Sequence, residues 1–201
     1  MITLRRFRRL EQAICEAGYA EDISWSEALG PPEDAEAFGR AAAYVIVNSG
    51  MKNKVAELIY AKCLKAIARG RSVTKVYGHY AKARAIDAIW QNRLRHFGTF
   101  VATDDKLAFC HALPWIGPVT QYHLAKDLGV DVAKPDVHLA RLAARDRTTV
   151  ERMCKRLSRL SGYRVATIDT VLWRACATGI LNSRRYETAG WRLAFKGKPK
   201  N

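Results

Sequence analysis

The chain has 201 residues, 49% of them hydrophobic, so it can bury a core and is not globally disordered. Lysine and arginine number 34 against 19 acidic residues, giving a formal net charge of +15. Such an excess predicts a polyanionic partner, most commonly nucleic acid. No apolar run is long enough to span a membrane, and the basic start MITLRRFRRL leads into EQAICEAG without a secretory segment. We therefore expect a cytoplasmic protein, nucleoid-associated if prokaryotic, that has no membrane partner.

Apolar residues recur at helical spacing, and no segment alternates convincingly like a strand. This pattern predicts an all-α fold of about nine or ten helices. In the first half, Gly18 ends one helix, an acidic turn after two prolines begins the next, and Gly70 ends a third. The helices predicted there cover 3–15, about 33–46, 53–68 and 80–95.

In the second half, capping signals mark the predicted helices. Thr103 is expected to cap a short helix that has Asp104 and Asp105 in its first turn. Thr148 and Glu151 form an apparent capping box before a basic helix to Leu160. A further helix is predicted over about 165–178.

The five cysteines are dispersed among apolar residues, and no two are spaced as CxxC. Such an odd, scattered set is typical of reduced, buried thiols, not of disulfides, a zinc site or an iron–sulfur cluster. We predict no metal centre. The cysteines are Cys15, Cys63, Cys110, Cys154 and Cys176.

The most informative segment runs from Leu113 to Arg145, LPWIGPVTQYHLAKDLGVDVAKPDVHLARLAAR. Its pattern predicts a tight hairpin that opens one helix, a short link, and a second helix that begins after Asp136. Backbone N–H groups at the first helix start could hold a phosphate. A phosphate anchor followed by a single carboxylate suits chemistry on nucleic acid.

The pattern LP-x-IG-x-x-T followed by PDVHLARLAAR resembles the helix-hairpin-helix DNA glycosylase superfamily, which includes endonuclease III and 8-oxoguanine glycosylase. The DVH triplet and Ala143-x-Arg-Asp146 are most similar to the 8-oxoguanine enzymes. The resemblance implies a two-lobed all-α fold (HhH-GPD) with a DNA-binding cleft between the lobes. Residues 35–132 would form a helical barrel that includes the hairpin. Residues 1–34 and 133–201 would form the second lobe, which carries the catalytic aspartate.

Two residues depart from the family pattern. Trp115 replaces the first hairpin glycine, so a residue that disfavours positive φ has to build the turn. Val119 replaces the lysine that attacks the sugar in bifunctional members, and valine cannot form a Schiff base. The resemblance therefore implies a monofunctional enzyme in which Asp136 assists departure of the base and water completes hydrolysis. Asp136 is also suited to be an N-cap, and the two roles are compatible.

The resemblance also implies how DNA is held. Gly117, Val119 and Thr120 would offer backbone N–H groups to a phosphate, and Pro114 and Trp115 belong to the same DNA-contacting hairpin. The hairpin carbonyls could hold a monovalent cation, and no other cofactor is expected. The resemblance further implies that the protein is a monomer and that its partner is double-stranded DNA.

Three further contacts have competing interpretations. His138 is a phosphate contact or a partly buried polar residue. Asn48, in the break Asn48–Ser49–Gly50, is the wedge that replaces an extruded base or an ordinary helix C-cap, and Met51 and Lys52 could border the same cleft. Tyr122 and His123 line the base pocket, or are respectively a core residue and a solvated one. Lys126 is expected to be a surface lysine, a displaced nucleophile being the alternative.

The sequence thus predicts a DNA N-glycosylase, a hydrolase that removes a damaged, mismatched or modified base during base excision repair. The alternatives are a non-catalytic helix-hairpin-helix DNA-binding protein and a base-modification enzyme on the same scaffold. Basic clusters in two predicted helices are individually solvated faces, some of which should line the DNA side. They comprise Arg5, Arg6, Arg8, Arg9, Lys155, Arg156 and Arg159.

Overall fold

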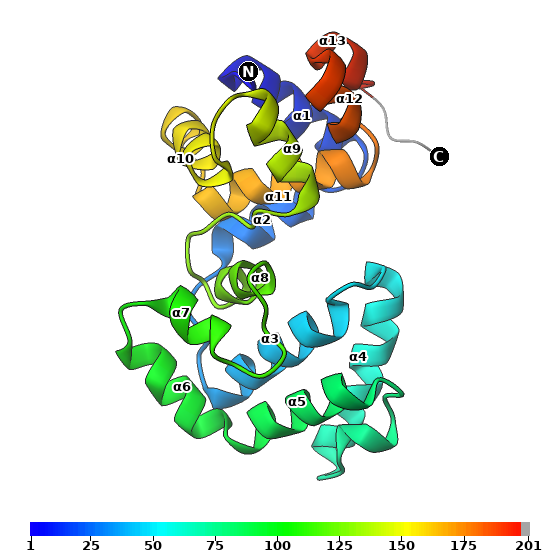
Figure 1. Ribbon diagram of the computed structural model, residues 1–201, viewed down its shortest axis with the longest axis vertical. Coiled ribbons are helices and arrows are strands. Elements are labelled where there is room, and N and C mark those ends of the chain that lie inside the picture. The colour runs from blue at the N-terminus through cyan, green and yellow to red at the C-terminus, as the bar shows by residue number, and fades with distance from the viewer. Residues whose placement is uncertain (198–201) are drawn as a thin grey trace. The chain divides into compact units, whose positions relative to one another are not determined.

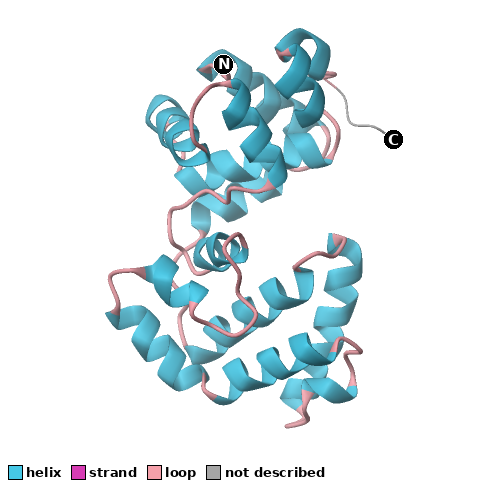
Figure 2. Cartoon of the chain, in the orientation of Figure 1, coloured by secondary structure: helices cyan, strands magenta, loops and turns pink. Residues whose placement is uncertain are grey.

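A computed structural model of the chain describes residues 1–197. Over these residues the fold is all-α, with thirteen α-helices and one 3₁₀ turn (Figure 2). The only strand-like pairing among them is an isolated bridge between Leu181 and Phe195. The predicted all-α class is confirmed, although the expected number of helices was too low. No helix in this part of the chain is both long and apolar enough to cross a membrane.

Contacts divide the chain into two compact units. Unit 1 comprises Met1–Leu29 and Asp131–Asn201, described up to residue 197, and unit 2 comprises Gly30–Val130. Each unit has a central helix with neighbours packed around it.

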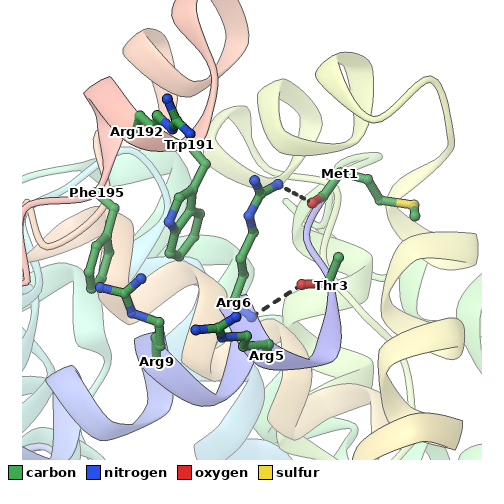
Figure 3. Close-up of a pocket in the computed structure, with 8 residues that line it drawn as sticks. All are labelled: Met1, Thr3, Arg5, Arg6, Arg9, Trp191, Arg192 and Phe195. Atoms are coloured by element: carbon green, nitrogen blue, oxygen red, sulfur yellow. Dashed lines mark hydrogen bonds between the residues drawn. The ribbon is translucent and has the colours of Figure 1, made fainter.

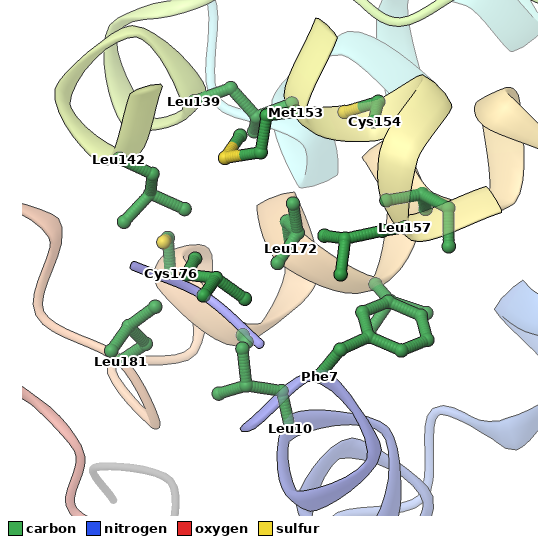
Figure 4. Close-up of a cluster of buried hydrophobic side chains, with 14 of the residues drawn as sticks. Phe7, Leu10, Leu139, Leu142, Met153, Cys154, Leu157, Leu172, Cys176 and Leu181 are labelled. Atoms are coloured by element: carbon green, nitrogen blue, oxygen red, sulfur yellow. The ribbon is translucent and has the colours of Figure 1, made fainter. Parts of the chain in front are cut away.

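In unit 1 the central helix is α11, whose residues from Val165 to Leu172 are all buried. It packs against α1, α2, α9 and α10. Apolar side chains of these helices meet in one core, part of which Figure 4 shows. The helices of this unit, labelled in Figure 1, are α1 (Leu4–Glu16), α2 (Ala20–Ala28), α9 (Val137–Arg145), α10 (Val150–Ser161), α11 (Val165–Ala177), α12 (Ser183–Ala189) and α13 (Trp191–Ala194).

In unit 2 the central helix is α3, which packs against α4, α5, α6 and α8. Gly39 allows a close approach on α3, because a Cβ atom there would lie 2.8 Å from a ring carbon of Trp90 on α5. The elements of this unit are α3 (Ala35–Asn48), α4 (Asn53–Ala68), η1 (Val73–Lys75), α5 (Tyr80–Gln91), α6 (Arg93–Ala102), α7 (Lys106–His111) and α8 (Thr120–Asp127).

The start of α10 differs from the predicted capping box by one residue. The cap is Thr149, whose hydroxyl accepts the N–H of Arg152 at 3.1 Å. The N–H of Thr148 instead donates to the carbonyl of Ala143, so Thr148 belongs to the turn that follows α9. Glu151 pairs with Lys155 on the next turn. The prediction that Thr148 and Glu151 form the box was therefore wrong.

The predicted helix over 80–95 is in fact two helices. Asn92 separates α5 from α6, and its side-chain amide donates to the carbonyl of Ala88 at 2.9 Å. The predicted cap of the following helix was also wrong, because Thr103 ends α6. Asp105 caps α7, where its carboxylate accepts the N–H of Ala108.

All five cysteines are free thiols within residues 1–197, and the predicted burial is confirmed for four of them. Four of them are buried and Cys15 is half-buried. Burial raises the pKa of Cys110 to about 12, which keeps that thiol protonated and unreactive at neutral pH.

Candidate functional site

Asp136 is the N-cap of α9. Its Oδ1 atom accepts the backbone N–H groups of His138 at 2.9 Å and Leu139 at 3.0 Å. Its Oδ2 atom accepts no hydrogen bond from residues 1–197, and the side chain is only half-buried. The predicted cap is thus confirmed. The two N–H groups fix the orientation of the carboxylate and leave one oxygen available to a ligand.

The surroundings of Asp136 are partly apolar. The pKa of the buried Cys176 thiol on α11 is raised to about 12, mainly by burial and to a smaller extent by the negative charge of Asp136. On α9, the Nδ1 atom of His138 lies 2.9 Å from the hydroxyl of the buried Ser183. His138 is therefore partly buried, as one interpretation expected, and its Nε2 atom remains without a partner among the described residues. The hydrogen bond to Ser183 fixes the direction in which that nitrogen points.

The hairpin precedes α8 in unit 2. Leu113 and Ile116 are buried and anchor it, whereas Pro114 is exposed, and Trp115 and Val119 are 44% and 43% exposed. The N–H of Gly117 donates to the Thr120 hydroxyl at 2.7 Å. Of the three N–H groups expected to hold a phosphate, that of Gly117 is thus already engaged within the hairpin.

The other two N–H groups remain available. Those of Val119 and Thr120 donate to no acceptor within residues 1–197. They lie at the start of α8, where unpaired N–H groups and the helix dipole favour an anion. For a monovalent cation, the candidate ligands are the carbonyls of Trp115 and Ile116, which accept no hydrogen bond in this part of the chain. No group of three or more His, Cys, Asp or Glu side chains suited to a metal ion occurs among the described residues.

Trp115 has a φ of +66°, so the turn is indeed built from a residue that disfavours this conformation. Its ring packs edge-on against His79, with 5.1 Å between the ring centroids. His79 is the N-cap of α5. The tryptophan therefore retains a tight turn and connects the hairpin to a neighbouring helix.

We expect Trp115→Gly to be more stable than Trp115→Ala by about 1 kcal/mol, because both lose the ring but only alanine keeps the strained φ. Urea unfolding of both variants measures the difference. Leu94, an exposed residue on α6, is the control position. There we expect Leu94→Ala to be more stable than Leu94→Gly by about 1 kcal/mol, because alanine is the better helix former. Alanine ranking above glycine at position 115 would contradict the positive φ.

Asn48 is the last residue of α3, and its carbonyl accepts the N–H of Met51. The loop that follows is held by Lys82, a buried lysine on α5 whose ammonium donates to the carbonyls of Val47 at 3.2 Å and Ser49 at 2.5 Å. Burial lowers the pKa of Lys82. Sequence reasoning missed this lysine, because nothing in its local pattern distinguishes it from a surface lysine.

His123 belongs to an aromatic cluster. Its ring lies edge-on to Tyr44 at 6.2 Å, and Tyr44 lies edge-on to Tyr60 at 5.4 Å. The Nε2 atom of His123 is 3.6 Å from the carboxylate of Asp127, and its side chain is only 17% exposed. The alternative interpretation, a solvated His123, was therefore wrong. Tyr122 is half-buried.

Tyr44, a member of this aromatic cluster, lies one helical turn before Asn48 on α3. Tyr44 also donates its hydroxyl to the side chain of Asn53 at 2.7 Å. Sequence reasoning missed Tyr44 and Tyr60, although the spacing of four residues between Tyr44 and Asn48 places both on one helix face. The signal that could have identified these tyrosines is an aromatic residue one helical turn from the predicted wedge.

Two lysines lie near the predicted site residues: Lys126, the alternative nucleophile, and Lys52, which was expected to border the cleft. Lys126 is 9% exposed on α8, so the expectation of a surface lysine was wrong. Lys52 is exposed and precedes α4. Leu124, Ala125 and Lys126 are consecutive and all buried, so α8 is covered on more than one side at this point.

The predicted site residues fall in both units. Asp136 and His138 belong to unit 1, whereas Asn48, the hairpin, Tyr122 and His123 belong to unit 2.

No known protein family matches the chain, and comparison with curated proteins and with solved structures gave no match either.

Proposed function

We propose that the protein is a monofunctional DNA glycosylase, which hydrolyses the N-glycosidic bond of a damaged, mismatched or modified base. The observation that carries this proposal is the carboxylate of Asp136, oriented by two backbone N–H groups with one oxygen left for a ligand. The net charge of +15 supports a nucleic-acid substrate. The resemblance of Leu113–Asp146 to the glycosylase motif specifies the reaction.

The chemistry requires little more than this carboxylate. As the base leaves with the electrons of the glycosidic bond, positive charge develops on the sugar. The free Oδ2 atom of Asp136 would stabilise that charge and orient a water molecule, which adds to the sugar carbon. The water loses a proton, the departing base gains one, and an abasic site remains.

Binding would use the hairpin. The free N–H groups of Val119 and Thr120 would hold a phosphate of the strand that carries the target base. The Nε2 atom of His138 would contact a second phosphate. These contacts carry no sequence information, so they suit an enzyme that acts at a lesion in any sequence context.

Extrusion of the base requires a wedge and a pocket. Asn48 is the proposed wedge, and the connection of its loop to the buried Lys82 limits how far the loop can move. Tyr44, Tyr60 and His123 would offer ring faces and edges to the extruded base, and Tyr122 would border them.

The proposal is tested with a panel of duplexes, each carrying one lesion or mismatch, followed by alkaline cleavage at abasic sites. We expect release of at least one base. Tight binding without release from any duplex would instead favour a non-catalytic DNA-binding protein. Mass spectrometry of the product separates hydrolysis, which leaves an abasic site, from transfer of a group to the base.

Because Val119 cannot form a Schiff base, borohydride should trap no covalent adduct between the wild-type protein and its substrate. Val119→Lys introduces an amine at a 43%-exposed position beside the hairpin, and this variant is expected to yield a trapped adduct. Gel electrophoresis of borohydride-treated mixtures measures both. Efficient trapping by the wild type would contradict the monofunctional assignment, and Lys52→Met and Lys126→Met would then identify the nucleophile.

A further inference from the structure

Unit 1 contains a cavity of about 770 Å³ that no part of the proposed reaction uses. Four arginines and two aromatic side chains line it (Figure 3). Arg5, Arg6 and Arg9 come from α1, and Arg192 comes from α13. Residues near the two ends of the chain therefore concentrate positive charge around one hollow.

The charge in this cavity is not compensated by the protein. No acidic side chain lines it, and none of its four arginines forms an ion pair within residues 1–197. On the same helix, by contrast, Arg8 pairs with Glu11 at 2.8 Å. Four guanidinium groups around one hollow repel one another, and a bound anion would relieve that repulsion.

The aromatic rings hold the arginines in place. Trp191 and Phe195 stack on each other, with 4.7 Å between ring centroids and 12° between ring planes. The guanidinium of Arg6 lies 5.4 Å from the Trp191 ring centroid, and that of Arg9 lies 4.8 Å from that of Phe195 (Figure 3). A guanidinium over a ring keeps in-plane N–H donors for a phosphate, and of the two only Arg6 already uses one nitrogen among the described residues, which donates to the carbonyl of Met1 at 2.5 Å.

This arrangement indicates what the cavity recognises. The stacked rings contact each other and the arginines, so they offer little free surface to a base. The lining provides guanidinium donors but no carboxylate or amide side chain that could read the edge of a base. A guanidinium can also pair with the acceptor edge of guanine, but four fork-shaped donors without a carboxylate or amide side chain beside them best suit the phosphates of a nucleic-acid backbone.

We propose that this cavity binds backbone phosphates of a nucleic-acid strand, as a second contact separate from the hairpin. The inference rests on the nucleic-acid partner of the proposed function, but not on its chemistry. A free polyphosphate offers the same oxygen atoms, so the test includes both sources.

The test compares two double variants that each remove two exposed positive charges from unit 1. Arg5→Gln/Arg9→Gln alters the cavity, and Arg152→Gln/Arg159→Gln alters α10 outside it. Fluorescence anisotropy measures affinity for an undamaged duplex over a range of salt concentrations. The cavity variant should bind roughly 10- to 100-fold more weakly, and its salt slope should fall by about two units. The control variant should lose less than about threefold.

Equal losses in the two variants would show a bulk charge effect and overturn the inference, as would unchanged affinity in both. If tripolyphosphate binding is lost while duplex affinity is retained, the cavity belongs to a free polyphosphate. Loss of binding only to vesicles of anionic phospholipid would assign it to a membrane surface. Base release at saturating protein should not change in the cavity variant. A wild type that releases no base but shows the cavity-specific loss would refute the proposed function and retain this inference.

Discussion

Asp136→Asn is expected to slow base release by at least about 100-fold, the effect of removing one electrostatic group from a reaction centre. The free Oδ2 atom of the carboxylate would become an uncharged amide, which stabilises the developing positive charge on the sugar poorly. Single-turnover release from the substrate that the lesion panel identifies measures the effect.

The same variant should retain its fold and its DNA affinity. Asparagine is as good an N-cap as aspartate, and its carbonyl oxygen can accept the N–H groups of His138 and Leu139 that Oδ1 accepts now. Removal of a negative charge near the DNA would, if anything, strengthen binding. Thermal unfolding and anisotropy check both points.

Asp34→Asn is the matched control. Asp34 is the N-cap of α3, where its Oδ1 atom accepts the N–H of Ala37 at 2.7 Å, so the chemical change is identical. We expect normal base release from this variant. Wild-type release by Asp136→Asn, or an equal loss in both variants, would contradict a catalytic role for Asp136.

Features determined by neighbouring residues could be predicted from the sequence. The helix predicted over 53–68 agrees with α4, because its apolar spacing ends at Gly70. The capping role of Asp136 also follows from its local pattern, and the positive φ of Trp115 follows from the resemblance of the hairpin to the family motif. Each depends on residues within one turn of the chain.

Features that depend on distant residues could not be predicted. The ammonium of Lys82 bonds to the end of α3, and the ring of His123 meets Tyr44 from another helix. The helix α2 was missed because its apolar residues form no clear face, and only Ile23 and Ser26 are buried. The break at Asn92 was missed because the apolar spacing continues past it into α6.

Gly129→Ala is expected to destabilise the protein by about 3–5 kcal/mol, which is exceptional for the addition of one methyl group. Gly129 follows α8 with a φ of +82°. A Cβ atom there would lie 2.2 Å from the carbonyl carbon of Gly30 and 2.6 Å from the nitrogen of Pro31. Both contacts are with backbone atoms, which cannot turn aside as a flexible side chain can, so the two ends of unit 2 would have to separate.

Gly70→Ala is the control, because it measures the cost of the positive φ without the steric clash. Gly70 follows α4 with a φ of +64°, and an added Cβ atom would meet nothing within 4 Å. Both glycines end a helix with the same hydrogen bonds: Gly129 donates to Lys126, Gly70 donates to Ile67, and the next residue donates to the carbonyl five positions before it. Gly70→Ala should therefore lose only about 1–2 kcal/mol.

Urea unfolding of the two variants measures the difference, and failure of Gly129→Ala to fold while Gly70→Ala folds would satisfy the prediction. Equal losses would contradict the close approach of Gly129 to Gly30. Because Gly129 ends the helix whose first residues carry the free N–H groups of the hairpin, a folded Gly129→Ala variant should also bind DNA more weakly than Gly70→Ala.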